Sequence, residues 1–179
     1  MGESEAIDFE EMLQYLQLAW EAHWYHTKPG HERFRRHDGA TPFFVHGQWA
    51  SATIMHEPLL PLELRWLGWR VLVLHDVRED TDLPIPEWVP QEVVSLVEEM
   101  TFATTQEGME RIWERSPEAQ LLTCYDKASV LQDATWMEQR PPEYRRAYKG
   151  YALRLATLAR ERYGDLNICR IIQAVCQMV

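Results

Sequence analysis

The stretch LHDVREDT, residues 74–81, places one histidine and three acidic residues directly behind the apolar run WRVLV of residues 69–73. Apolar side chains recur there at helical spacing, and one face of the helix would carry Leu64, Leu67, Gly68, Val71, Leu72 and His75. We therefore expect a helix over residues 61–78, with His75 and Asp76 near its end. These charged groups form either a solvated helix end or the centre of a site.

The same spacing predicts helices in most of the remaining chain. They cover residues 8–28, 43–56, 91–101, 105–115, 117–136, 143–163 and 165–178. Prolines and glycines interrupt the pattern in KPGHERFRRHDGATP (28–42) and DTDLPIPEWVP (80–90), which we expect to be loops. No neighbouring runs alternate with period two, so the sequence predicts an all-α fold, and 179 residues fit one domain over residues 1–179. The tryptophans expected to pack internally are Trp20, Trp24, Trp49, Trp66 and Trp69.

The formal net charge is −10, from 28 acidic and 18 basic residues. Nonspecific nucleic-acid binding needs a broad basic surface, so we expect no nucleic-acid partner. A small anionic substrate stays compatible with this charge, because a bound metal ion can invert the local field. The chain has no apolar run long enough to span a bilayer, and its three cysteines form no CxxC pair. The acidic stretch MGESEAIDFEEML lacks the basic and apolar regions of a signal peptide, so we expect no secretory leader. We therefore expect no membrane partner, reduced thiols and a cytoplasmic protein.

Two further residues have surroundings like those of His75 and Asp76. His46 follows a proline and an apolar run in TPFFVH, and Asp126 lies on the apolar face expected for LLTCYDKASVL. Burying a carboxylate is costly unless it is paired or bound to a metal. Two imidazoles and two carboxylates suit a divalent ion such as Zn, Fe, Mn or Mg. For Asp126 the alternatives are a metal ligand and a buried acid paired with Arg or Lys.

Basic residues gather in HERFRRHDG, residues 31–39, although the chain is acidic overall. A basic loop beside an acidic metal site would supply paired hydrogen-bond donors for phosphate, and arginine suits that role best. The alternative is a solvated basic loop without a ligand.

The order His46, His75-Asp76, Asp126 resembles the H…HD…D motif of the HD-domain metal-dependent phosphohydrolases. More specifically, the chain is similar over roughly residues 19–163 to the hydrolase domain of the RelA/SpoT family and its small stand-alone relatives. VLVLHDVREDTD is close to the family block LLHDVxEDT, and RFRRHDGATPFFVH to its basic loop and RxxGxPYxxHP motif. Further segments resemble family blocks in the same order: VSLVEEMTF, LLTCYDKASVLQDA and RPPEYRRAYKGYALRLATLARERYG.

This resemblance implies an all-α HD-domain bundle with one divalent metal, Mn²⁺ first, with Fe, Zn and Mg as alternatives. It implies a small anionic nucleotide substrate: a metal-bound water would hydrolyse the 3′-pyrophosphate of (p)ppGpp. Matched residue by residue, the metal ligands are His46, His75, Asp76 and Asp126. Glu79 and Asp80 match the pair that positions and activates the water. Arg36 matches the arginine that contacts substrate, and Arg35 is the substitute because GATP holds one extra residue.

The chain departs from the family where substrate is held. The family's DRLHN is Asp126-Lys127-Ala128-Ser129-Val130 here, and Val130 cannot form the hydrogen bonds of the family's Asn. The family's HP is His46-Gly47 and its TK is Thr101-Phe102. The metal set is therefore complete, whereas the substrate set has changed.

Two alternatives to a (p)ppGpp hydrolase follow from these departures. One is another HD-type nucleotidase or nucleoside triphosphohydrolase, because DLPIPE (82–87) resembles the DLPTP loop of the 5′-deoxynucleotidase branch. The other is a catalytically weak domain that senses a nucleotide or binds a protein.

Overall fold

A computed structural model of the chain describes residues 8–35, 38–133 and 137–178. These residues form helices and no strand, which confirms the predicted all-α fold. The described residues also contain two isolated antiparallel β-bridges, Thr27–Thr81 and Phe34–Pro42. The helices are α1 (Phe9–Tyr25), α2 (Val45–Met55), α3 (Leu62–Leu74), α4 (Val77–Asp80), α5 (Gln91–Met100), α6 (Thr105–Arg111), the 3₁₀ turn η1 (Ile112–Glu114), α7 (Pro117–Leu131), α9 (Pro142–Tyr163) and α10 (Asn167–Met178).

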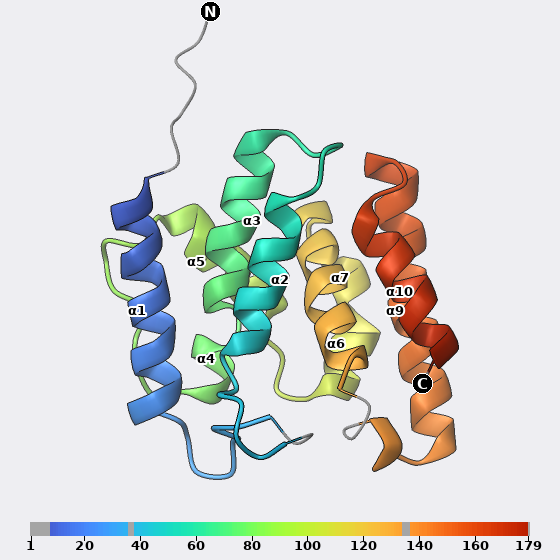
Figure 1. Cartoon of the computed structure of the whole chain (residues 1–179), viewed down its shortest axis with the longest axis horizontal. Coiled ribbons are helices and arrows are strands. Elements are labelled where there is room, and N and C mark those ends of the chain that lie inside the picture. Colours follow the sequence, from blue (N-terminus) through green and yellow to red (C-terminus); the bar gives the residue numbers. More distant parts are fainter. Residues whose placement is uncertain (1–7, 36–37, 134–136, 179) are drawn as a thin grey trace, which may run out of the picture.

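The central pair of the bundle is α2 and α3, which run side by side in the middle of the molecule (Figure 1). Helices α1 and α5 pack against α3, while α7 packs against α2 and carries α9 and α10 on its other side. This arrangement places the start of α2, the end of α3 and the middle of α7 around one region of the interior. Among the described helices, none is both long and apolar enough to cross a membrane.

The expected single helix over residues 61–78 is wrong in one respect, because it is divided in two. Helix α3 ends at Leu74, and the one-turn helix α4 begins at Val77. His75 and Asp76 between them keep right-handed helical dihedrals, with φ −57° and ψ −35° for His75 and φ −91° and ψ −6° for Asp76. The chain thus bends without unwinding, and the His-Asp pair occupies the bend. Helix α7 also ends earlier than expected, at Leu131, and residues 134–136 of the expected helix lie outside the described part of the chain.

The loop after α1 is held against the segment that follows α4. The backbone N–H of Lys28 donates to the Asp80 carbonyl at 2.8 Å, and the N–H of Asp82 donates to the His26 carbonyl at 2.9 Å. These bonds flank the Thr27–Thr81 bridge. The basic loop predicted from the sequence therefore lies beside the HDVREDT segment.

The expectation that five tryptophans pack internally is wrong for two of them. Trp66 and Trp69 are buried and Trp49 is half-buried, but Trp20 and Trp24 are 41% and 36% exposed. Helix α1 lies at the edge of the bundle (Figure 1), so one of its faces meets solvent. On that face Trp20 and Trp24, one turn apart, stack on each other with ring centroids 6.3 Å apart.

One fully buried carboxylate fastens the last helix to the bundle. Glu57, in the turn between α2 and α3, accepts hydrogen bonds from the backbone N–H groups of Asn167 and Ile168 at 2.9 and 2.8 Å. These are N–H groups of the first turn of α10, which have no partner within the helix.

Glu57→Ala is therefore expected to lower the free energy of unfolding by about 2–4 kcal/mol, because it removes the acceptor of the buried Ile168 N–H and of the part-buried Asn167 N–H. Chemical denaturation measures this loss. Glu87→Ala, which removes an exposed loop carboxylate, is the matched control and should change little. Equal stability of the two variants would contradict the role given to Glu57.

Candidate metal centre

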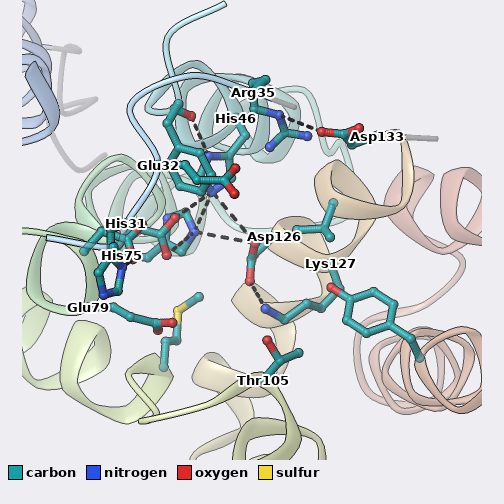
Figure 2. Close-up of a pocket in the computed structure, with 17 residues that line it drawn as sticks. His31, Glu32, Arg35, His46, His75, Glu79, Thr105, Asp126, Lys127 and Asp133 are labelled. Atoms are coloured by element: carbon teal, nitrogen blue, oxygen red, sulfur yellow. Dashed lines mark hydrogen bonds and ion pairs between the residues drawn. The ribbon is translucent and has the colours of Figure 1, made fainter. Parts of the chain in front are cut away.

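Two imidazoles face each other where α2 begins and α3 ends. The Nδ1 of His46 lies 2.8 Å from the Phe43 carbonyl oxygen, and the Nδ1 of His75 lies 2.8 Å from the Leu72 carbonyl oxygen. A carbonyl oxygen only accepts, so both Nδ1 atoms carry the hydrogen, and each Nε2 of the neutral rings presents a lone pair. The two Nε2 atoms are 3.1 Å apart (Figure 2).

Two carboxylates approach the same Nε2 atoms. The Oδ2 of Asp76 is 2.8 Å from the Nε2 of His46, and its Oδ1 is 3.2 Å from the Nε2 of His75. The Oδ1 of Asp126, from the middle of α7, is 3.5 Å from His75 and 4.0 Å from His46. The structure thus brings together all four residues that the sequence singled out as ligands.

The chemistry of this donor set fits a divalent cation. Ligand atoms of His46, His75 and Asp126 lie within 4.8 Å of one another, and all three residues are buried. Two lone pairs 3.1 Å apart repel unless a positive charge lies between them, and two nitrogens bound at about 2.0–2.1 Å to one ion are separated by about that distance. Carbonyl acceptors behind both imidazoles are the usual outer partners of metal-bound histidine.

Protonation behaviour points in the same direction. Burial disfavours the charged form of His75, but the Asp76 carboxylate and the hydrogen bond to Asp126 outweigh it and raise the pKa of His75 to about 10. Burial likewise opposes ionisation of Asp76, yet the imidazoles of His75 and His46 hold its pKa below the usual range. The carboxylates of the centre therefore stabilise a positive charge at His75. In the metal-free protein a proton on the imidazole supplies this charge, and a bound cation would replace it.

The contacts of Asp126 fit both alternatives that the sequence left open. Its Oδ1 faces the imidazoles, while its Oδ2 lies 2.5 Å from the Nζ of Lys127, the next residue in the chain (Figure 2). Burial opposes its ionisation, but Lys127 and then His75 keep the pKa of Asp126 well below its usual range. One carboxylate thus both faces the imidazoles and pairs with a half-buried lysine.

Gly47 allows α2 and α3 to approach each other beside the centre. A Cβ at this position would lie 2.8 Å from the Leu72 carbonyl oxygen and 3.6 Å from Cε1 of His75. The Leu72 oxygen is the atom that orients His75 through its Nδ1–H. Glycine after His46 thus allows the Leu72 carbonyl oxygen and the His75 ring to lie close to α2.

Gly47→Ala is therefore expected to weaken Mn²⁺ binding about 10-fold or more, because it displaces the carbonyl that orients His75. Isothermal titration of the metal-free protein with Mn²⁺ measures this effect. Gly68→Ala is the matched control, since its Cβ would meet only the flexible side-chain ends of Ile54 on α2 and Leu122 on α7. The control should lose stability but keep its Mn²⁺ affinity, whereas an unchanged affinity in Gly47→Ala would contradict this account.

Glu79 and Asp80 of α4 line the same cavity as the four candidate ligands. Burial, and then the Asp76 carboxylate, raise the pKa of Glu79 to about 7. Burial, followed by Asp76 and Glu79, raises the pKa of Asp80 to about 8. Both groups can therefore exchange protons near neutral pH, as general bases require.

The two arginines predicted to contact substrate have different outcomes. Arg35 is buried at the cavity wall, where its Nε is 3.5 Å from the Asp133 carboxylate and its Nη2 donates to the Ser129 carbonyl at 3.3 Å (Figure 2). Arg36 lies outside the described residues. The structure thus places Arg35 at the site, where it is paired with the acidic side chain of Asp133.

The cavity above the centre has a volume of about 260 Å³. Val130 and Met100 line it, so an apolar surface stands where the hydrolases that the sequence resembles have Asn. No residue of DLPIPE (82–87) lines it, which leaves the likeness to the deoxynucleotidase loop without structural support. The lining residues are Gly30, His31, Glu32, Arg35, Phe43, His46, His75, Asp76, Glu79, Asp80, Met100, Thr105, Asp126, Lys127, Val130, Asp133 and Tyr148.

Sequence reasoning missed several of these residues as parts of the site. His31 was noted within the basic loop, but nothing local indicated that its ring lies 2.7 Å from Asp80. The pairing of Lys127 with Asp126 could have been predicted, because Lys127 is the basic residue adjacent to this buried acid in the sequence. Tyr148 carried no signal, since an aromatic residue on an amphipathic helix predicts core packing.

Comparisons with known proteins support the fold. No family model matches the chain, and no curated protein matches it in sequence. One similar solved structure is described as "A metazoan ortholog of SpoT hydrolyzes ppGpp and plays a role in starvation responses". Its TM-score is 0.72 at 21% identity, and the superposition covers 97% of each chain. The chain therefore has the same overall all-α fold as this metazoan SpoT orthologue.

Proposed function

We propose that the chain is a metal-dependent phosphohydrolase, a single HD-type domain that hydrolyses a nucleotide, with the 3′-pyrophosphate of (p)ppGpp as the first substrate to test. The observation that carries this proposal is the convergence of two imidazoles and two carboxylates below a cavity that Glu79 and Asp80 also line. The shared fold supports it, because the similar structure is described as a protein that hydrolyses ppGpp.

In this proposal His46, His75, Asp76 and Asp126 hold one divalent cation. A cation there would polarise a phosphate oxygen and make a water molecule more acidic. Two neutral nitrogens with two carboxylates favour Mn²⁺, with Fe, Zn and Mg as alternatives. Metal analysis of the purified protein should find about one such ion per chain.

The chain's own residues then handle the proton and the phosphate. Glu79, or Asp80 beside it, accepts a proton from the attacking water as the water oxygen bonds to phosphorus. The bond between phosphorus and the leaving 3′ oxygen breaks, and that oxygen takes up a proton from solvent. Arg35 and Lys127 offer positive charge to the phosphates from the cavity wall. Arg36 would add a further guanidinium, as the family resemblance implies.

A hydrolysis panel tests this function directly. The purified protein with Mn²⁺ is incubated with ppGpp, NADPH and deoxynucleoside triphosphates, and the products are separated by anion exchange. Release of pyrophosphate from ppGpp supports the proposal, and turnover of the triphosphates alone would favour the nucleotidase alternative. Absence of any turnover would contradict the hydrolase function.

Val130 supports a second candidate function, nucleotide sensing without turnover. Its side chain lines the cavity and cannot donate a hydrogen bond to a base. If ppGpp raises the melting temperature but is not cleaved, sensing replaces hydrolysis as the function.

A further inference from the structure

The short helix that carries Glu79 and Asp80 depends on outside contacts for its position. Helix α4 has four residues, which is one turn, and so short a helix is not stable by itself. The Nζ of Lys28 donates to the carbonyl oxygens of Arg78 and Glu79 at 2.8 and 3.0 Å. The backbone N–H of Lys28 donates to the Asp80 carbonyl. The loop after α1 thus satisfies the carbonyl groups that the end of α4 leaves open.

The same loop reaches the carboxylate of Asp80 through His31. The Nδ1 of His31 lies 2.7 Å from the Oδ1 of Asp80, which is within the range of a hydrogen bond. The side chain of Asp80 is 11% exposed and that of His31 is 37% exposed, and both line the cavity. The imidazole therefore approaches a largely buried carboxylate from the solvent side.

This contact determines which oxygen of Asp80 remains for other partners. A carboxylate at the end of a one-turn helix can rotate about its side-chain bonds unless a neighbour fixes it. With Oδ1 engaged by His31, Oδ2 is the oxygen left for a water molecule. Among the hydrogen bonds and ion pairs of the described residues, none other than that with His31 is made by the Asp80 carboxylate.

We propose that His31 is a positioning residue of the hydrolytic site: it fixes the Asp80 carboxylate through Oδ1, so that Oδ2 is oriented towards the attacking water. This inference rests on the proposed function and adds to it a residue from the basic loop. His31 acts through Asp80 and takes no part in metal binding.

Replacement of His31 by three different side chains tests this role. An Asn amide nitrogen reaches the place of Nδ1, whereas a Gln amide nitrogen reaches the place of Nε2 and Ala reaches neither. His31→Asn should retain most of kcat for ppGpp, while His31→Gln and His31→Ala should lose about 10- to 100-fold. KM should change less than kcat, because His31 acts on Asp80.

A matched control separates this effect from damage to the loop. His26→Ala removes another histidine of the same loop, whose ring makes no hydrogen bond with a described residue, and it should leave kcat unchanged. Thermal melts of all variants establish that they fold. Equal kcat values for the Asn, Gln and Ala variants would overturn the inference.

A second readout does not depend on turnover. The ¹⁵N shifts of the His31 imidazole should change in Asp80→Asn, which removes the carboxylate partner, and should stay constant in the neighbouring Asp82→Asn. Unchanged shifts in Asp80→Asn would overturn the inference even if the protein is an active hydrolase. If the unmodified protein hydrolyses no substrate, the proposed function fails, and the shifts still decide whether the His31–Asp80 pair exists.

Discussion

Asp76→Ala is expected to abolish both Mn²⁺ binding and hydrolysis of ppGpp. Asp76 is the residue whose two oxygens reach both imidazoles, at 2.8 Å from His46 and 3.2 Å from His75. Its removal leaves two imidazoles and the lysine-paired Asp126 to hold a dication, with one negative charge fewer. We expect a loss of at least about 10³-fold in kcat/KM, since metal catalysis supplies several kcal/mol of transition-state stabilisation.

The control for this prediction is Asp82→Ala. Asp82 is an exposed carboxylate six residues further along the same segment, and its removal should leave metal content and turnover unchanged. Release of pyrophosphate and metal content are measured on the same preparations. Retention of either property in Asp76→Ala would show that the centre is not assembled as described.

Glu79→Gln is expected to separate catalysis from metal binding. The substitution keeps the shape of the side chain but removes its ability to accept a proton, so kcat should fall by about 10²- to 10⁴-fold. Because Glu79 is not among the four candidate ligands, metal content should remain near one ion per chain. Full activity of Glu79→Gln would assign the proton transfer to Asp80 alone.

The same variant has a predictable effect on stability. Burial and Asp76 raise the pKa of Glu79 from 4.5 to about 7, so the folded protein binds this proton more tightly than the unfolded chain. The contribution of Glu79 to the free energy of unfolding therefore falls as the pH rises above 4.5. The cost of burying its charged form is fully present above pH 7. Metal-free Glu79→Gln should melt at a higher temperature than the unmodified protein at pH 8, and the difference should disappear near pH 4. A lower melting temperature at pH 8 would contradict this reasoning.

The sequence was sufficient for the helices and the four convergent residues. Helical spacing located the helices to within a few residues, because each buries a single apolar face. His46, His75, Asp76 and Asp126 stood out as polar groups in apolar surroundings, and the structure brings them together. Their order in the chain supplied the resemblance to HD-domain hydrolases.

The features that sequence reasoning missed depend on contacts between distant segments. His31 and Asp80 are 49 positions apart, and Arg35 and the Ser129 carbonyl are 94 positions apart. Local patterns carry no information about such pairs. The bend at His75 was missed for another reason: its backbone stays close to helical, so apolar spacing continues across it. Trp20 showed the spacing of a core residue but lies on the outer face of an edge helix.

Titration of the metal-free protein with Mn²⁺ tests the central claim, that these four residues form a cation centre, most directly. With the pKa of His75 raised to about 10, the metal must displace a proton at neutral pH. Binding should therefore tighten by up to about 10-fold per pH unit between pH 6 and 8. We predict one site per chain, release of protons on binding, and loss of the site in Asp76→Ala. Absence of Mn²⁺ binding, or binding that Asp76→Ala leaves intact, would contradict the account.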